Sequence, residues 1–164
     1  MPEHFSNYYP NILVNIKTQE LIFHKKEDEK YTFNVSTSCY GVGNLKDSFK
    51  TPAGKHLIYK KIGEGEPIGR RFIARKPTNE IIKPNIESNE DYILTRILWL
   101  KGIEEGVNKS GDVDTLSRYI YIHGTHEEKN LGKPASHGCI RMSNADIIWL
   151  YDKVKVGALV TIDE

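Results

Sequence analysis

The sequence contains little cysteine, and neither sign of charge dominates it. The two cysteines, Cys39 and Cys139, lie far apart and form no CxxC pair, so neither a disulfide framework nor a zinc knuckle is predicted. Cys39 is interpreted as a small, buried or half-buried apolar residue. The formal net charge is +1, and acidic and basic residues are interspersed. Because nucleic-acid binding needs a one-sided basic patch, we expect no nucleic-acid partner.

Long apolar runs are also missing. The longest ones, such as Ile12–Val14 and Tyr119–Ile122, have the length of strands, whereas a membrane-spanning helix needs about 20 apolar residues. No membrane segment is therefore expected. Residues 1–10 lack the basic start, the apolar stretch and the small-residue cleavage site of a secretory signal. We expect a cytoplasmic protein if Met1 is the native start, and a periplasmic or cell-wall protein if an export signal has been removed.

The chain has the length of one folded domain. Its 164 residues suit a single core, and no repeat, low-complexity tract or linker divides residues 1–164. Short strands bounded by turns are predicted over residues 11–16, 20–24, 31–36, 56–62, 119–123 and 158–162. The first three are expected to form a meander. The stretch 63–89 has little periodicity and is expected to be a long loop or flap.

One helix is predicted, and it begins at Ser143. This serine stands three residues before Asp146, which is the capping-box spacing with Asp in place of Glu. Gly157 lies just beyond the expected end of the helix. The apolar residues at helical spacing are Ile147, Leu150, Tyr151 and Val154. We therefore predict a mostly β fold, a β-sandwich or a partly open barrel, with one clear helix near the C-terminus.

The segment Ser136–Met142 contains the residues best suited to chemistry. An unperturbed thiol has a pKa of about 8.5, so only a few per cent is thiolate near neutrality. A histidine close to Cys139 changes this by taking the proton or by stabilising the thiolate. Gly138 lets the backbone approach a substrate closely. It also suits a tight turn in which the N–H groups of Gly138 and Cys139 converge on a developing oxyanion.

Two histidines compete for the role of base. His137 is close to Cys139 in sequence, but residues two apart on an extended chain share a face without necessarily meeting. His123 stands at the end of a predicted strand, beside Gly124. Because a strand end is a rigid platform that favours accurate placement, His123 is the better candidate.

The pattern of His123 followed by Ser136–Arg141 resembles the L,D-transpeptidase (YkuD-type) family. The signature of that family joins a histidine to a downstream [Ser/Thr]-His-Gly-Cys-x-Arg segment, and this chain reads Ser-His-Gly-Cys-Ile-Arg. Other segments that look like family blocks occur in the expected order: Val35–Ser38, Thr51–Gly54 and Tyr121–Thr125. The resemblance covers nearly the whole chain, from about Ile12 to Ile162.

The resemblance implies that Cys139 is the nucleophile and His123 the base, with Gly124 in the position that orients the imidazole. His137 either takes part in the site or packs beside it. Arg141 either holds a substrate carboxylate through its planar fork or buttresses the loop behind Cys139.

Two hydroxyl residues next to these motifs are candidates for support or substrate contact. The side chains of Ser136 and Thr125 either make such hydrogen bonds or merely cap turns. Tyr92, Trp99, Tyr119 and Tyr121 either line the cleft or belong to the core. The sequence makes no prediction about the oligomeric state.

The resemblance also implies a reaction on peptidoglycan. The thiolate attacks the amide between the L-centre of diaminopimelate and the terminal D-Ala of a tetrapeptide stem, D-Ala leaves, and a thioester forms. Water, another stem's amine or an amine on a protein then resolves it. No metal or organic cofactor is required, and a carbapenem is expected to form an adduct with Cys139. Without an export signal, an L,D-carboxypeptidase acting on soluble, recycled muropeptides is favoured over a cross-linking or protein-anchoring L,D-transpeptidase.

Two other classes of protein compete with this interpretation. A metal hydrolase would use His123, His126, His137 and Cys139 as zinc ligands, although their spacing is not that of HExxH or of paired CxxC knuckles. A non-catalytic peptidoglycan-binding module would need no nucleophile, which the presence of both His123 and Cys139 argues against.

Overall fold

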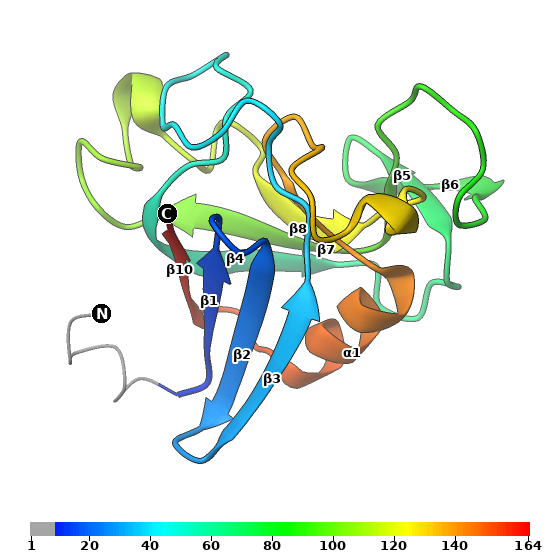
Figure 1. Ribbon diagram of the computed structural model, residues 1–164, viewed down its shortest axis with the longest axis horizontal. Helices are drawn as coiled ribbons and strands as arrows, with labels where there is room; N and C mark the ends of the chain where they lie inside the picture. The colour runs from blue at the N-terminus through cyan, green and yellow to red at the C-terminus, as the bar shows by residue number, and fades with distance from the viewer. Residues whose placement is uncertain (1–8) are drawn as a thin grey trace.

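The computed structural model describes residues 9–164, and strands dominate it. Within these residues, one α-helix, α1 (Asn144–Lys153), and two short 3-10 helices, Gly111–Val113 and Glu128–Asn130, accompany a ten-stranded sheet. Figure 1 shows the strands β1 (Asn11–Asn15), β2 (Glu20–Lys26), β3 (Glu29–Asn34), β4 (Gly54–Ile62), β5 (Arg70–Ile73), β6 (Lys76–Ile81), β7 (Ile93–Gly102) and β8 (Tyr121–Gly124), followed in the chain by β9 (Ile140–Met142) and β10 (Leu159–Asp163).

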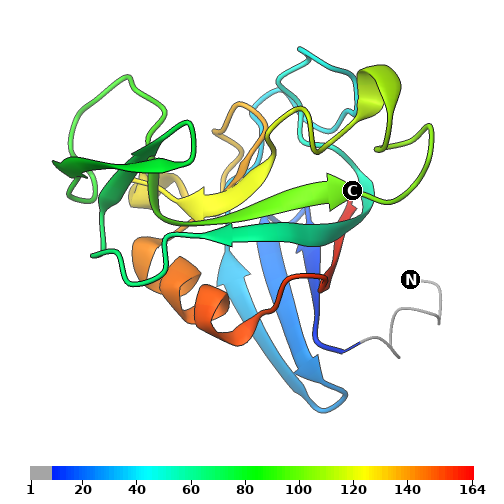
Figure 2. The same cartoon turned by 180° about the vertical axis from the view of Figure 1, so that it is seen from behind.

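The sheet is strongly curled. Strands β1, β2 and β3 form the predicted antiparallel meander, and β1 pairs in parallel with β10. Strand β10 joins this meander to β4, which pairs with β7. Figures 1 and 2 show the meander standing at a steep angle to β4 and β7. The predicted class, mostly β with a partly open barrel and one helix near the C-terminus, is confirmed.

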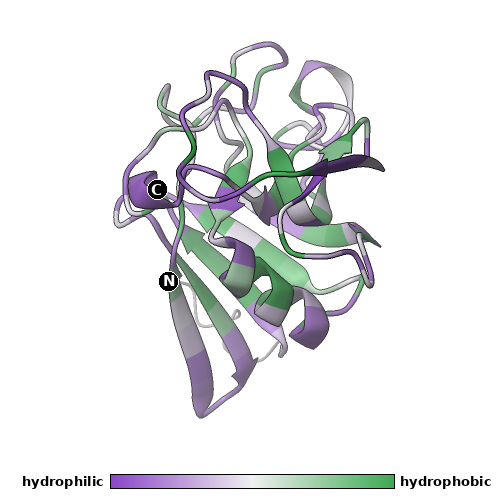
Figure 3. Ribbon diagram, turned by 90° about the vertical axis from the view of Figure 1, so that its right-hand side faces the viewer, coloured by the Kyte–Doolittle hydropathy of each residue, from purple (hydrophilic) through white to green (hydrophobic). Residues whose placement is uncertain are grey.

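Helix α1 packs against β7 and β8 and begins where the sequence predicts. The Ser143 hydroxyl oxygen accepts a hydrogen bond from the Asp146 N–H at 3.1 Å, which satisfies one of the free N–H groups of the first turn. Ile147 and Leu150 are fully buried. The Trp149 ring packs on the aromatic rings of the meander, those of Phe23, Tyr31 and Phe33. Figure 3 shows the apolar residues gathered on the sheet and on α1, with hydrophilic ones at the tip of the β2–β3 hairpin.

Strand β7 organises the rest of the sheet. It pairs with β4 along one edge and with β8 along the other, and β5 continues the first edge beyond the end of β4. Strand β8 pairs in parallel with β9, which puts His123 beside Arg141. The two separate parts of the sequence signature are thus neighbours in one sheet.

The stretch 63–89, expected to be a loop or flap, contains the β5–β6 hairpin. The expectation was wrong because the hairpin lacks the usual sequence signals. Its turn is made by Ala74 and Arg75, both with positive φ (49° and 65°), rather than by the Asn-Gly or Asp-Gly pairs that such turns favour. Strand β6 contains Pro77, which is tolerated because β6 lies at the edge of the sheet.

The structure bears differently on the expectations about the N-terminus and about Cys39. Residues 1–8, on which the expectation about location depends, lie outside the described residues. In the described part, no helix is both long enough and apolar enough to cross a bilayer. Cys39 is exposed rather than buried, because it follows the buried residues Val35–Ser38 at the start of a turn, and turns lie on the surface.

Candidate active site

Cys139 lies immediately before β9, against the first residues of β8. Its side chain is half-buried. The sulfur accepts a hydrogen bond from the Tyr121 N–H at 3.4 Å, and the S–H lies 3.6 Å from the Tyr119 carbonyl oxygen. The side chain packs on a small apolar cluster that includes Phe72 and Ile97. The thiol is therefore held from one side by the backbone of residues 119–121.

The surroundings of the thiol favour its protonated form. Burial raises the pKa of Cys139 to about 12, and the Asp91 carboxylate adds to the rise. The Tyr121 N–H and the cations Arg141 and Arg118 lower the pKa, but they do not offset the loss of hydration. The resting thiol is neutral at physiological pH and needs a base to become a nucleophile.

His123 has the properties of that base. Its ring is 1% exposed, and Nδ1 lies 2.6 Å from the Gly124 carbonyl oxygen. Since a carbonyl oxygen only accepts, Nδ1 carries the proton and Nε2 is free to take one. Burial lowers the pKa of His123 below its ordinary value, and the Asp91 carboxylate and the Gly124 carbonyl offset this only in part. The imidazole is therefore neutral near pH 7.

The register of β8 turns the imidazole and the thiol to the same side. Residues two apart on a strand share a face, so His123 points to the face on which Tyr121 packs with Cys139. In the parallel ladder His123 pairs with Arg141, two residues after Cys139. The structure thus brings together the predicted nucleophile, the predicted base and Gly124.

Arg141 is buried, and both of its terminal nitrogens are paired with carboxylates of the protein. Its side chain is 4% exposed, with Nη2 2.5 Å from an Asp91 oxygen and Nη1 2.8 Å from a Glu127 oxygen. Of the two roles left open by the sequence, this geometry favours the buttress, because a substrate carboxylate would have to displace one of these partners.

Asp91 is a site residue that the sequence analysis missed. Burial alone would raise its pKa, but His123 in its protonated form and the charge of Arg141 outweigh burial and hold the pKa below its usual range. The carboxylate is therefore ionised beside the imidazole. Asp91 and Glu127 stand in charged, loop-like sequence, where no spacing distinguishes them from solvated acids.

His137 lies at the rim of the site. Its side chain is 51% exposed, and Nδ1 lies 3.7 Å from an Asp91 oxygen. The ring stacks on Tyr40, with 6.2 Å between ring centroids. Because the His137 ring is exposed and held by Tyr40, it is better suited to contact a substrate than to act as the buried general base.

The turn before Cys139 is fastened by Ser136. Its hydroxyl donates to the Cys139 carbonyl oxygen at 2.6 Å and accepts from the Gly138 N–H at 3.2 Å. The Gly138 N–H, predicted for the oxyanion hole, therefore already has a partner. Within residues 9–164 the N–H groups of His137 and Cys139 make no hydrogen bond. Gly138 has φ of 129°. This conformation favours glycine, because a residue with a side chain would be strained there even if the side chain had room.

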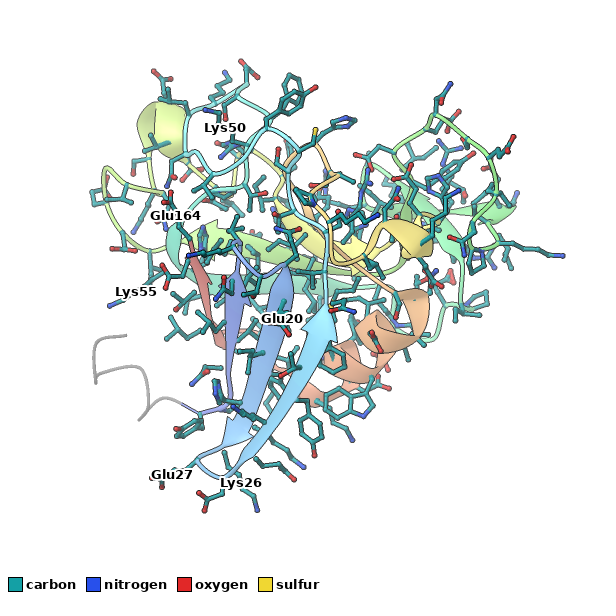
Figure 4. All side chains as sticks on the ribbon, viewed as in Figure 1. Glu20, Lys26, Glu27, Lys50, Lys55 and Glu164 are labelled. Carbon is teal, nitrogen blue, oxygen red and sulfur yellow. The ribbon has the colours of Figure 1, made fainter. Side chains whose placement is uncertain are left out.

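The other sequence blocks that resembled the family meet at this turn. The Thr51 hydroxyl donates to the Gly138 carbonyl oxygen at 2.9 Å, and Ser38 forms a β-bridge with Ser136. Figure 4 shows Lys50, next to Thr51, among the loops at the opposite end of the molecule from Lys26 at the β2–β3 tip. The blocks therefore brace the motif loop from a distant part of the chain.

Thr125 caps the turn after β8, and Gly124 is the last residue of that strand. The Thr125 hydroxyl oxygen accepts from the Glu127 N–H at 3.1 Å, and the side chain is 1% exposed, which favours turn capping over substrate contact. A Cβ on Gly124 would lie 2.5 Å from the Asn144 side-chain oxygen and 2.7 Å from the Leu94 carbonyl oxygen. Gly124 is therefore needed for close packing of β8 against β7 and α1.

The residues of the competing zinc interpretation do not assemble into a ligand set. Among residues 9–164, no three His, Cys, Asp or Glu side chains are arranged to hold a metal ion. His126 instead packs edge-on against the Tyr92 ring, 4.8 Å between centroids.

Comparison with known proteins gives one consistent family. The family model of the L,D-transpeptidase catalytic domain, YkuD, matches residues 10–162. YqjB of Bacillus subtilis, named as an L,D-transpeptidase, is 28% identical over 155 residues, which are 94% of this chain and 72% of that protein. YbiS of Escherichia coli, also named as one, is 46% identical over 50 residues, or 30% of this chain and 16% of that protein.

Solved structures share the fold. An L,D-transpeptidase from Mycobacterium smegmatis aligns with a TM-score of 0.54 at 16% identity, over 93% of this chain and 58% of that one. L,D-transpeptidase 3 from Mycobacterium tuberculosis, solved with a faropenem-derived adduct, aligns with a TM-score of 0.56 at 16% identity, over 93% of this chain and 59% of that one. The chain thus spans somewhat more than half the length of these structures.

Proposed function

The chain belongs to the L,D-transpeptidase (YkuD) family of cysteine enzymes that act on peptidoglycan, and from this premise we propose that Cys139 cleaves the diaminopimelate–D-Ala bond of a tetrapeptide stem. The observation that carries the proposal is that the thiol and a buried imidazole lie on the same face of β8 and the chain that pairs with it. The Nδ1 of His123 is fixed on the Gly124 carbonyl at 2.6 Å, which leaves Nε2 as the proton acceptor.

The proposed acylation follows from these protonation states. As the sulfur attacks the scissile carbonyl carbon, Nε2 of His123 takes the thiol proton, and the carbonyl oxygen becomes an oxyanion. When the oxyanion collapses, the C–N bond breaks and the imidazolium gives its proton to the leaving nitrogen. D-Ala departs, and the stem remains bound to Cys139 as a thioester.

Two backbone N–H groups are available to the oxyanion. Those of Cys139 and His137 make no hydrogen bond within the described chain, whereas Gly138 already donates to Ser136. We assign the oxyanion hole to Cys139 and His137 on this ground, with Gly138 shaping the turn between them.

We propose water as the acceptor that resolves the thioester, so that the enzyme is an L,D-carboxypeptidase. The side chain of Cys139 is half-buried rather than sealed, which supports direct access for water. An amine acceptor, and hence transpeptidation, is the second candidate. Its support is the Asp91 carboxylate, 38% exposed beside His137, which would attract an ammonium group.

Mass spectrometry of a tetrapeptide muropeptide incubated with the wild type and with Cys139→Ala tests both points. Loss of one alanine, in the wild type alone and without a dimer, is the result we expect. Accumulation of a dimer would show that an amine, rather than water, is the acceptor. An unchanged muropeptide with both proteins would overturn the proposed substrate.

A further inference from the structure

Arg75 is held by aromatic residues, two of which also contact the reactive thiol. It occupies the turn of the β5–β6 hairpin, and Figure 1 shows β8 pointing toward that hairpin. The guanidinium carbon lies 4.7 Å from the centroid of the Tyr119 ring and 5.2 Å from that of Trp99. Its Nη1 donates to the Tyr121 hydroxyl at 3.0 Å. Stacking and this hydrogen bond together fix the plane of the guanidinium.

The residues that hold Arg75 are those that hold the sulfur. The backbone of Tyr121 donates to the sulfur of Cys139, and the backbone of Tyr119 faces its S–H. The ring of Tyr121 also packs in the apolar cluster that Cys139 joins. The guanidinium and the thiol therefore both contact Tyr119 and Tyr121.

Arg75 differs from the other arginines of the described chain in what it binds. Arg70, Arg71 and Arg141 are paired with carboxylates of the protein. Arg96 and Arg118 donate to backbone carbonyls. Arg75 makes one hydrogen bond, to a phenol, and no ion pair, so most of its five N–H donors remain unused.

We propose that Arg75 binds the terminal carboxylate of the leaving D-alanine, an inference that rests on the proposed function of the site. In the stem, only three covalent bonds separate the scissile carbonyl carbon from the carbon of that carboxylate, so the negative charge must lie close to the sulfur. On the side of His123 it would meet Asp91 and Glu127. On the side of Tyr119 it meets a fixed, unpaired guanidinium whose fork matches a carboxylate.

The test compares two substrates that differ only in that charge: a tetrapeptide stem with a free C-terminal D-Ala, and the same stem ending in D-alaninamide. For the free acid, Arg75→Gln is expected to lower kcat/KM by about 10- to 100-fold, mainly through KM, the size expected for a lost charge-assisted hydrogen bond. For the amide, Arg75→Gln should change little. Lys76→Gln removes a neighbouring exposed charge on the same hairpin and should leave both substrates unchanged.

Equal losses on the two substrates, or no loss on either, would overturn the role of Arg75. If the wild type turned over neither stem, the proposed function would fail instead. The subsite is then judged by calorimetric binding of the free-acid peptide to Cys139→Ala and to the double variant Cys139→Ala/Arg75→Gln. Weaker binding by the double variant would support the carboxylate subsite, and equal binding would contradict it.

Discussion

The thiol and the imidazole are expected to be neutral in the free enzyme. Burial raises the pKa of Cys139 to about 12 and lowers the pKa of His123 below 6.5. Such a pair differs from a preformed thiolate–imidazolium pair, because the proton moves only when a substrate is attacked. The enzyme should therefore react slowly with simple alkylating agents while remaining active on its own substrate.

This pair predicts the acidic limb of the pH–rate profile. His123 works as a base only when neutral, so kcat/KM should fall as the pH drops through the lowered pKa of His123, below 6.5. Because the Asp91 carboxylate raises the pKa of His123, Asp91→Asn should move the limb to still lower pH. Steady-state kinetics across the acid range measure both.

Glu127→Gln is the matched control for the Asp91 variant. It also removes one carboxylate from Arg141, but Glu127 is not among the groups that shift the pKa of His123. Its acidic limb should coincide with that of the wild type. A limb above 6.5 in the wild type, or equal shifts in both variants, would contradict the assignment.

The position of β8 depends on an irregularity in β7. The register with β8 shifts between Leu94 and Ile97, and Thr95 there has φ of 76°, unusual for a β-branched residue. The buried Thr95 hydroxyl donates to the Asn144 side-chain oxygen at 2.5 Å and accepts from the Gly69 N–H at 3.0 Å. One hydroxyl thus joins β7, helix α1 and the loop before β5, directly beside the close-packed Gly124.

Thr95→Val and Thr95→Ser separate this hydroxyl from the shape of the side chain. Valine keeps the shape but leaves two buried polar groups without a partner, so the free energy of unfolding should fall by about 1–3 kcal/mol. Serine keeps both hydrogen bonds and relieves the β-branch, so its stability should stay near that of the wild type. Urea unfolding of both variants measures the difference. Equal destabilisation by the two would assign the effect to shape rather than to hydrogen bonding.

The elements with strong local signals were predictable from the sequence, and those made by distant pairing were not. The helix after Ser143 and the meander follow from a cap and from short alternating runs. The three-residue strand β9 has no signal of its own, since it exists only through its pairing with β8. The β5–β6 hairpin was missed because its turn uses Ala74 and Arg75, and Arg75 went unnoticed with it.

The same division applies to the site. Cys139, His123 and Gly124 were identified from a motif, and the structure places His123 and Gly124 in β8 and Cys139 against the first residues of that strand. Asp91 was not identified, because the contact that makes it important is with Arg141, far along the chain. Gly138 was assigned to the oxyanion hole from its sequence position alone, while the hydrogen bond from its N–H to Ser136 depends on how the turn folds.

The stability of the whole molecule should depend on pH through a histidine outside the site. His56 is fully buried between the Gly54 carbonyl and the Thr115 hydroxyl, and burial lowers its pKa to about 4. Between about 4 and 6.5 the unfolded chain binds a proton that the folded chain does not, so stability is lost as the pH falls through this window. The loss from this group should approach about 3 kcal/mol.

Urea unfolding at about pH 7.5 and at about pH 5 measures this effect. His56→Gln is the comparison, and it should show a smaller difference between the two pH values, whatever its absolute stability. An undiminished difference in the variant would assign the pH dependence to other groups.

The central claim is that Cys139, deprotonated by His123, carries the stem as a thioester. The most direct test is intact-protein mass spectrometry of an acid-quenched mixture of enzyme and tetrapeptide stem. The wild type and Cys39→Ser should gain the mass of the stem without its terminal alanine, Cys139→Ala should gain nothing, and His123→Ala should acylate far more slowly. Release of alanine by Cys139→Ala, or an adduct that requires Cys39, would contradict the account.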